Sequence, residues 1–180
     1  QGKATGQGCR HVALSFDFVG VLKLCAAAIT LAFMGTGAAM AQTSPLPTVQ
    51  ATTLPTGASV STGAASVNTT GANMTITQTS DKASINWQSF SIGSGATVNI
   101  AQPNTSAVLL NRVVGNDPSQ IFGKLSANGQ IVLINPNGIV FGRDGSVTAS
   151  TFTASTFGMS DADFMNGFYK FSRNGSSAGI

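Results

Sequence analysis

From Asn73 onward the chain is a series of short β-forming runs separated by turn residues, and this pattern restricts the fold more than any other feature. In several runs apolar and polar residues alternate, as in Ile85-Asn-Trp87 and Val98-Asn-Ile100, which is the period of a half-buried strand. The runs are separated by segments such as Gly93-Ser-Gly95, whose residues favour turns. Only Asp161 to Asn166 is a candidate for a helix, and a short one. The pattern predicts an all-β domain.

Short strands with turns between them fit a sandwich, a barrel or a β-solenoid, so composition has to separate these folds. Only 8% of the residues are charged, against roughly 25% in an ordinary soluble domain. Stacked coils need few charges because like residues lie above one another, and they favour Asn, Ser, Thr and Gly at the bends. Composition therefore favours the solenoid, although no clean repeat period can be measured, and the other two folds stay open.

The formal net charge of +3 is concentrated near the N-terminus. Lys3, Arg10, Lys23 and Asp17 contribute +2 before residue 24, and the chain from Gln42 onward contributes only +1. Because the positive charges do not gather along the folded part, they indicate no nucleic-acid partner.

An export signal is predicted over residues 1–41. Lys23 precedes an uninterrupted apolar run from Leu24 to Met34, and Ala39 and Ala41 are the small residues that signal peptidase needs before the bond to Gln42. We expect cleavage after Ala41. The apolar run is shorter than the roughly 18 residues that a membrane-spanning helix needs.

Cleavage would remove the groups on which most catalytic and metal sites depend. Both cysteines, Cys9 and Cys25, and the single histidine, His11, lie in the removed part. The remaining acids are scattered, except for Asp161 and Asp163, which flank Ala162 in a stretch that reads as a loop. We therefore expect no catalytic residues, no metal site, no cofactor and no enzymatic activity.

Residues 42–70 are rich in Pro, Thr, Ser, Ala and Gly, and their apolar residues are isolated. This composition predicts an extended leader, a first strand or an N-terminal cap that is weakly ordered by itself. We expect the ordered domain to occupy residues 71–180.

One turn is defined closely enough to predict its geometry. Asn135-Pro-Asn-Gly138 lies between two apolar runs, the second of which begins at Ile139. In a type I turn Pro136 takes the second position, Asn137 the third and Gly138 the fourth, where a positive φ is tolerated. The Asn135 side chain can accept a backbone hydrogen bond in an Asx-turn. At minimum these residues turn the chain tightly between two buried strands.

An ordered set of motifs resembles the N-terminal secretion domain of the filamentous haemagglutinin family, particularly the branch with the high-molecular-weight adhesins. The similarity runs from about Gly71 to the end of the chain. The segments that carry it are Ile85-Asn-Trp87, Phe90-Ser-Ile92, Gln102-Pro-Asn104, Leu110-Asn-Arg-Val113, residues 121–129, residues 131–142 and Ala154-Ser-Thr156. A second family motif, Asn-Pro-Asn-Leu, has no literal copy here, and Gln102-Pro-Asn-Thr105 is its nearest analogue.

The resemblance implies a right-handed, single-stranded parallel β-helix with additional β elements, and export by two-partner secretion. In that system an outer-membrane β-barrel transporter with periplasmic domains recognises the secretion domain. It also implies that the secretion domain is truncated at its C-terminal end, so that Ile180 is a fragment edge. The whole protein would be longer, secreted by or bound to the surface of a Gram-negative bacterium, with an adhesin, haemolysin or contact-dependent toxin region beyond Ile180. Ligands on host or neighbouring cells would bind that region.

The resemblance makes Asn135, Pro136, Asn137, Gly138 and Ile139 the expected motif for transporter recognition and early folding. For direct recognition, Asn135 and Asn137 are the better candidates, because exposed amides offer both donors and acceptors. We expect Trp87 to be a core aromatic and Arg112 a charge at a strand edge.

A carbohydrate-binding or polysaccharide-processing β-helix is the alternative, because fold does not determine function. A glycan-binding module would expose aromatic side chains. Phe152, Phe157 and Phe168 could serve that role or fill a solenoid core, so the sequence leaves binding open.

Overall fold

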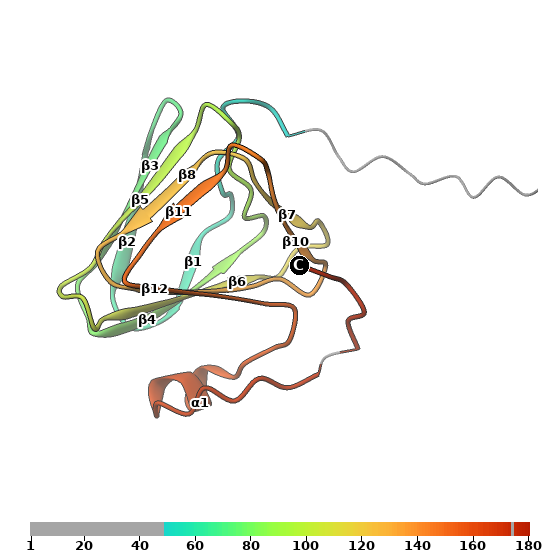
Figure 1. Cartoon of the computed structure of the whole chain (residues 1–180). Coiled ribbons are helices and arrows are strands. Elements are labelled where there is room, and N and C mark those ends of the chain that lie inside the picture. Colours follow the sequence, from blue (N-terminus) through green and yellow to red (C-terminus); the bar gives the residue numbers. More distant parts are fainter. Residues whose placement is uncertain (1–48, 174) are drawn as a thin grey trace, which may run out of the picture. The chain divides into compact units, whose positions relative to one another are not determined.

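The computed structural model describes residues 49–173 and 175–180 (Figure 1). Ala39, Ala41 and Gln42, at the predicted signal peptidase site, lie outside the described residues, as do Cys9, Cys25 and His11. The elements are β1 (Ser59–Thr62), β2 (Ala65–Thr70), β3 (Asn73–Gln78), β4 (Lys82–Trp87), β5 (Thr97–Ala101), β6 (Val108–Val113), β7 (Ser119–Ile121), β8 (Lys124–Ala127), β9 (Gln130–Ile134), β10 (Ile139–Phe141), β11 (Ser146–Thr148), β12 (Thr151–Ser155) and α1 (Asp161–Met165).

Strands β3 to β12 wind into a parallel β-helix of about four coils, which confirms the predicted fold class. Strands β3, β5, β8 and β11 pair in parallel to form one sheet, and β4, β6, β9 and β12 form the second. Strands β7 and β10 form the third, which a parallel bridge from Ile92 to Ile121 extends toward the first coil. The three sheets are the three sides of the coil in Figure 1.

Successive coils differ in length. Asn73, Thr97, Lys124 and Ser146 stack above one another at the start of the first sheet, so equivalent positions are unevenly spaced along the chain. The bends absorb these differences while the strands keep their register. For this reason the sequence shows strand alternation but no clean repeat.

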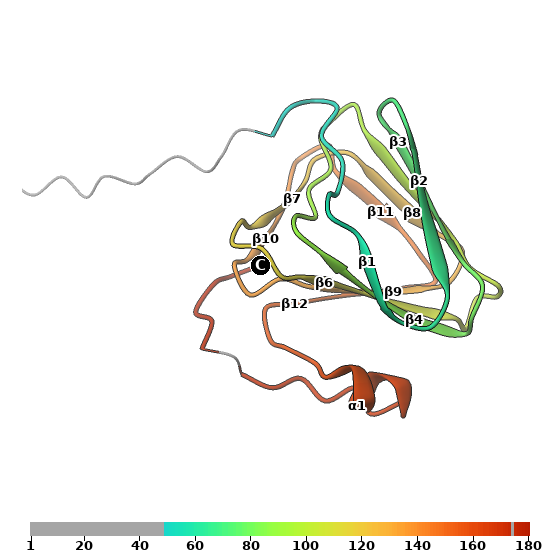
Figure 2. The same cartoon turned by 180° about the vertical axis from the view of Figure 1, so that it is seen from behind.

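The N-terminal end of the β-helix is covered by two strands that run antiparallel to the strands of the first coil (Figure 2). Strand β1 pairs with β4, and β2 pairs with β3, so each is the terminal strand of its sheet. These strands satisfy backbone groups that the first coil would otherwise expose as open edges. Residues 59–70 therefore have the form of the first strand and N-terminal cap that were among the alternatives for residues 42–70. Order begins before residue 71, because these residues gain order from pairing that their composition does not reveal.

The interior of the coil is apolar and closely packed. Inward positions of neighbouring strands form columns, such as Trp87 beside Val113. Trp87 has no exposed surface, and its ring centroid lies 5.4 Å from that of Phe90 in an edge-to-face contact. Its indole Nε1 donates a 3.0 Å hydrogen bond to Asn111 Oδ1. The prediction of Trp87 as a core aromatic is confirmed.

The two central strands of the second sheet, β6 and β9, carry apolar side chains on the outer face as well, because residues 156–172 lie against them. We call this segment the C-terminal strap. A second core cluster lies between the sheet and the strap and contains Val108, Leu110, Val132, Ile134, Met159 and Phe164, with Phe171 packed against it. Burial on both faces explains why the runs that form β6 and β9 are almost continuously apolar instead of alternating.

The strap contains α1, which confirms the predicted short helix; Asp161 and Asp163 therefore lie in a helix and not in a loop. Ser160 caps its N-terminus by accepting from the Asp163 backbone N–H. Within residues 49–173 and 175–180, no helix is long and apolar enough to cross a membrane.

Charged side chains hold the strap on the sheet. Arg112 Nη2 lies 2.8 Å from Asp161 Oδ1 and 2.7 Å from the Met159 carbonyl oxygen. Lys82 Nζ donates to the carbonyl oxygens of Phe164 and Met165, at the C-terminal end of α1. The expectation of Arg112 as a strand-edge charge is wrong, because β6 lies in the middle of its sheet and Arg112 points to the strap.

Candidate functional site

The Asn135-Pro-Asn-Gly138 turn joins β9 to β10 and has the predicted geometry. The Gly138 N–H donates to the Asn135 carbonyl oxygen at 3.1 Å, which closes the turn. The Asn137 N–H donates to Asn135 Oδ1 at 2.9 Å, which forms the expected Asx-turn. Gly138 has a φ of 104°, a conformation that side-chain-bearing residues rarely adopt. The sequence alone therefore predicted the internal structure of this turn.

The Asn135 side chain does not lie on the surface. It has no exposed area, because position 135 continues the inward-facing series of Ile131 and Leu133. Its Nδ2 donates to Ser119 Oγ at 2.9 Å and to the Asp117 carbonyl oxygen at 3.0 Å. The expectation of an exposed amide at Asn135 is wrong. The alternation of the preceding strand, extended by one step, carried the signal that the side chain points inward.

Asn137 is half-buried and faces the preceding coil. Its Nδ2 donates to the Gly115 carbonyl oxygen at 2.8 Å and to Asn135 Oδ1 at 3.2 Å. The amides of Asn135 and Asn137 together tie the turn to residues 115–119, which make the equivalent bend one coil earlier. Both amides thus stabilise coil stacking, and the exposure expected of Asn137 is only partial.

On its other side the turn contacts the C-terminal tail, residues 175–180. Ile139 is 1% exposed, and its N–H donates to the Gly179 carbonyl oxygen at 3.2 Å. Pro136 is half-buried. Its carbonyl oxygen accepts a hydrogen bond from the Ser176 hydroxyl. All five predicted motif residues, Asn135, Pro136, Asn137, Gly138 and Ile139, therefore lie between an earlier coil and the tail.

Gln102-Pro-Asn-Thr105, the nearest analogue of the second family motif, also forms a turn, at a different corner of the coil. Asn104 Oδ1 accepts from the Ser106 N–H at 2.9 Å. The side chain of Gln102 is buried, and its Nε2 donates to Gln78 Oε1 at 3.0 Å and to the Ala107 carbonyl oxygen at 2.9 Å. Its Oε1 accepts from the Gly129 N–H at 3.0 Å.

Sequence reasoning missed this glutamine network. Gln78 follows Met74 and Ile76 in the inward series of β3, so its position in the alternation was the available signal. A buried glutamine is tolerated here because its amide bonds to other coils instead of water. The network joins three successive coils at one corner.

One ion pair gives the site region its clearest electrostatic feature. Burial raises the pKa of Asp161, but hydrogen bonds from Arg112, Ser61 and Ser84, together with the Arg112 charge, outweigh burial. The pKa of Asp161 therefore lies below its ordinary value, and the carboxylate stays ionised at neutral pH. Its function in the fold is to hold α1 on β4 and β6.

The groups at the Asn-Pro-Asn-Gly turn are amides, hydroxyls and backbone groups, which suit binding and folding. In the described part of the chain, no three His, Cys, Asp or Glu side chains are grouped closely enough to hold a metal ion.

Comparison with known proteins agrees with this architecture. The family model of the TPS (two-partner secretion) secretion domain matches residues 51–179, which include every strand and the strap. The chain belongs to the TPS secretion domain family. Proteins with this domain are secreted across the outer membrane of Gram-negative bacteria, and an outer-membrane transporter partner recognises the domain. The resemblance identified from the motifs is confirmed.

Two relatives and one solved structure show how far the similarity to other TPS proteins extends. Two heme/hemopexin-binding proteins of Haemophilus influenzae, one of them from strain KW20 Rd, are each 43% identical over 105 and 103 residues, which is 58% and 57% of this chain. The crystal structure of the HMW1 secretion domain from Haemophilus influenzae matches with a TM-score of 0.66 and 35% identity, over 69% of this chain. The aligned region is 11% of each relative and 34% of the solved chain.

Proposed function

We propose that this chain is the secretion-targeting domain of a large exported surface protein of the adhesin or haemagglutinin type. An outer-membrane β-barrel transporter recognises the domain through its periplasmic domains. The observation that carries the proposal is that the matched residues, 51–179, coincide with the β-helix, its N-terminal strands and the strap. The family similarity therefore covers all the described strands and the strap and not a single motif.

Asn135, Pro136, Asn137, Gly138 and Ile139 act in this proposal mainly by folding the domain. The buried Asn135 amide joins the third coil to the second, and the half-buried Asn137 adds a bond to the same earlier bend. Each coil of a solenoid offers its open strands as a template for the next coil. A turn that locks two coils early would thus nucleate the β-helix and keep the domain in the form that the transporter recognises.

The export route begins in this proposal with cleavage of residues 1–41 after Ala41, which releases the chain into the periplasm. The mature protein is then secreted or stays on the cell surface. The proposal assigns no catalytic activity and no cofactor to residues 49–180. Two relatives are named for binding heme and hemopexin; in this protein, ligands on host or neighbouring cells would bind parts of a longer chain.

The test is co-expression of the chain in a Gram-negative host with and without the transporter encoded beside its gene. We expect the chain in the medium only when the transporter is present, as measured by immunoblot of medium and periplasm. Asn135→Ala should lower the secreted fraction. Asn116→Ala, which changes an exposed amide in the neighbouring bend, should leave it unchanged. Secretion without the transporter would contradict the proposal.

A further inference from the structure

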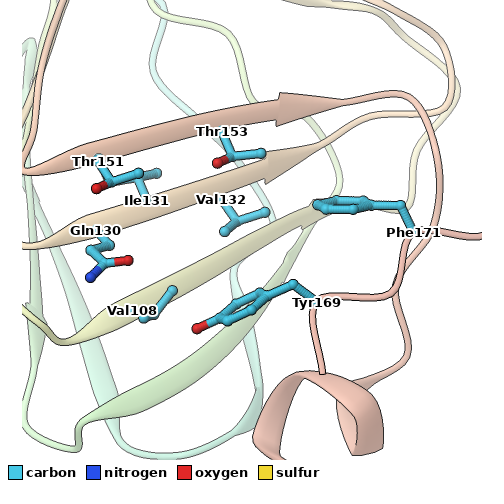
Figure 3. Close-up of a pocket in the computed structure, with 8 residues that line it drawn as sticks. All are labelled: Val108, Gln130, Ile131, Val132, Thr151, Thr153, Tyr169 and Phe171. Carbon is cyan, nitrogen blue, oxygen red and sulfur yellow. The ribbon is translucent and has the colours of Figure 1, made fainter. Parts of the chain in front are cut away.

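A groove runs along the outer face of the second sheet beside the C-terminal strap (Figure 3). Its narrow end is a hollow of about 160 Å³ beside Val132, Thr153 and Phe171. Its wide end is a hollow of about 690 Å³ beside Asp81, Asn104 and Ser106. The two hollows share Val108, Gln130 and Tyr169, so they form one continuous groove.

Aromatic rings from the strap form one wall of the groove. Tyr169 and Phe171 extend from the strap toward the strands in Figure 3. Tyr169 is 47% exposed, and its ring packs edge-to-face on the buried Phe164, with centroids 6.3 Å apart. The ring is therefore supported from behind while much of its surface is open to a ligand.

Amides and hydroxyls line the side opposite these rings. Gln130 of β9 and Thr151 of β12 are neighbours in the parallel register, and Thr153 follows on the same face of β12. The three polar side chains lie along the groove in Figure 3. They offer both donors and acceptors over the length of the narrow end.

The wide end adds a carboxylate and a further amide whose positions are linked. Asn104 Nδ2 donates to Asp81 Oδ1 at 3.1 Å. Lys82 also lines the wide end, and its Nζ donates to two carbonyl oxygens at the end of α1. Asp81 and Lys82 both line the wide end and their formal charges balance, so the groove has no net charge to attract an ionic ligand.

We propose that this groove binds a neutral saccharide, an activity separate from secretion. A neutral sugar has an apolar C–H face that packs on an aromatic ring and a rim of hydroxyls that both donate and accept. Tyr169 would stack on that face, while Gln130, Thr151 and Asn104 bind the hydroxyls. A hydrocarbon ligand would leave these polar groups without partners, and the carboxylate of an acidic sugar would find no net positive charge in the groove.

The composition of the chain permits a direct test, because Tyr169 is its only tyrosine and Trp87 its only tryptophan. The chain is labelled with carbon-13 at the tyrosine ring and titrated with neutral malto-, cello- and galacto-oligosaccharides. A uronic-acid oligosaccharide of equal length is the comparison. We expect at least one neutral series to shift the Tyr169 ring signal saturably. The proton signal of the buried Trp87 indole N–H should not shift. The uronic-acid series should not bind.

Three variants separate binding from folding. Gln130→Ala should weaken the affinity about tenfold, since it leaves ligand hydroxyls unpaired. Tyr169→Phe keeps the stacking surface and should bind within a few-fold of the parent, as measured by calorimetry. Phe168→Ala changes a ring that is 65% exposed and is not among the residues lining the two hollows, so it should leave the affinity unchanged.

Each contrary result overturns the proposal. Absence of a saturable shift with all three neutral series would exclude a saccharide site at Tyr169. Equal binding by the uronic-acid series would exclude selection for neutral sugars. Unchanged affinity in Gln130→Ala, with the Trp87 signal native, would place any binding outside the groove. Secretion by the transporter is measured separately and does not depend on these outcomes.

Discussion

Asn135 Nδ2 donates a hydrogen bond to Ser119 Oγ at 2.9 Å, and neither residue has any exposed surface. The two residues are sixteen positions apart in sequence but lie in neighbouring coils. A motif that reads as a surface turn is thus anchored in the interior by its first residue. This relationship assigns the motif to coil stacking first.

Asn135→Ala should lower the free energy of unfolding by about 2–3 kcal/mol. The change removes two donated hydrogen bonds and the acceptor of the Asn137 N–H, and it leaves the buried Ser119 hydroxyl without this partner. Urea unfolding followed by Trp87 fluorescence measures the loss. Asn116→Ala is the matched control, for which we expect a change within about 0.5 kcal/mol. Equal stability of the two variants would refute the anchoring role.

Gly138→Ala should destabilise the domain more than Gly175→Ala. Both glycines have positive φ, 104° and 86°, so alanine is strained at either site by about 1–3 kcal/mol. At Gly138 an added Cβ would also lie 3.2 Å from the Gly179 carbonyl oxygen, whereas it would meet nothing within 4 Å at Gly175. Comparing the two unfolding midpoints isolates the tail contact. If Gly175→Ala lowers the unfolding midpoint as much as Gly138→Ala does, the tail contact does not contribute to stability.

Gln102→Glu should lower the free energy of unfolding by about 3 kcal/mol or more at neutral pH. A carboxylate would place acceptors against Gln78 Oε1 and the Ala107 carbonyl oxygen, where the amide now donates. Burial should raise the pKa of the introduced carboxyl, so the penalty relative to the parent should shrink as the pH falls toward about 4. Unfolding at several pH values measures this difference. Gln88→Glu, at an exposed position, should show no such trend.

Acid should release the strap before the β-helix unfolds. The pKa of Asp161 is lowered in the folded protein, so its ion pair with Arg112 stabilises the fold above the unfolded pKa of about 3.9. That stabilisation is lost as the pH falls through the lower, folded value. The Phe164 N–H donates to the Ser160 carbonyl oxygen. Its protection against hydrogen exchange, measured relative to the intrinsic rate at each pH, should fall over this range.

Asp161→Asn provides the control for that titration. In this variant the Phe164 N–H should be less protected against hydrogen exchange than in the parent at neutral pH, and its protection should fall little further in acid. Added salt should narrow the difference, since the pair is partly open to solvent and ions screen it. A parent protein whose strap exchange is unaffected by acid would rule out the ion pair as its anchor.

Local rules allowed the strands and the Asn135 to Gly138 turn to be predicted correctly. Alternation along Val98-Asn-Ile100 predicted β5, and the Pro136 and Gly138 positions predicted the turn with its positive φ. These features depend on residues only a few positions apart. The alternation also pointed Asn135 inward, but its buried partner, Ser119 in the previous coil, could not be identified from neighbouring residues.

The sequence by itself determined an all-β chain with low charge, its turn positions and, through ordered motifs, its family. Only the tertiary structure decided that β1 and β2 cover the first coil, that Arg112 holds the strap and that Tyr169 lines a groove. The physical reason is the range of the interactions. Alternation and turn chemistry act between near neighbours, whereas strand pairing, ion pairs and grooves join residues whose spacing depends on the unequal coil lengths.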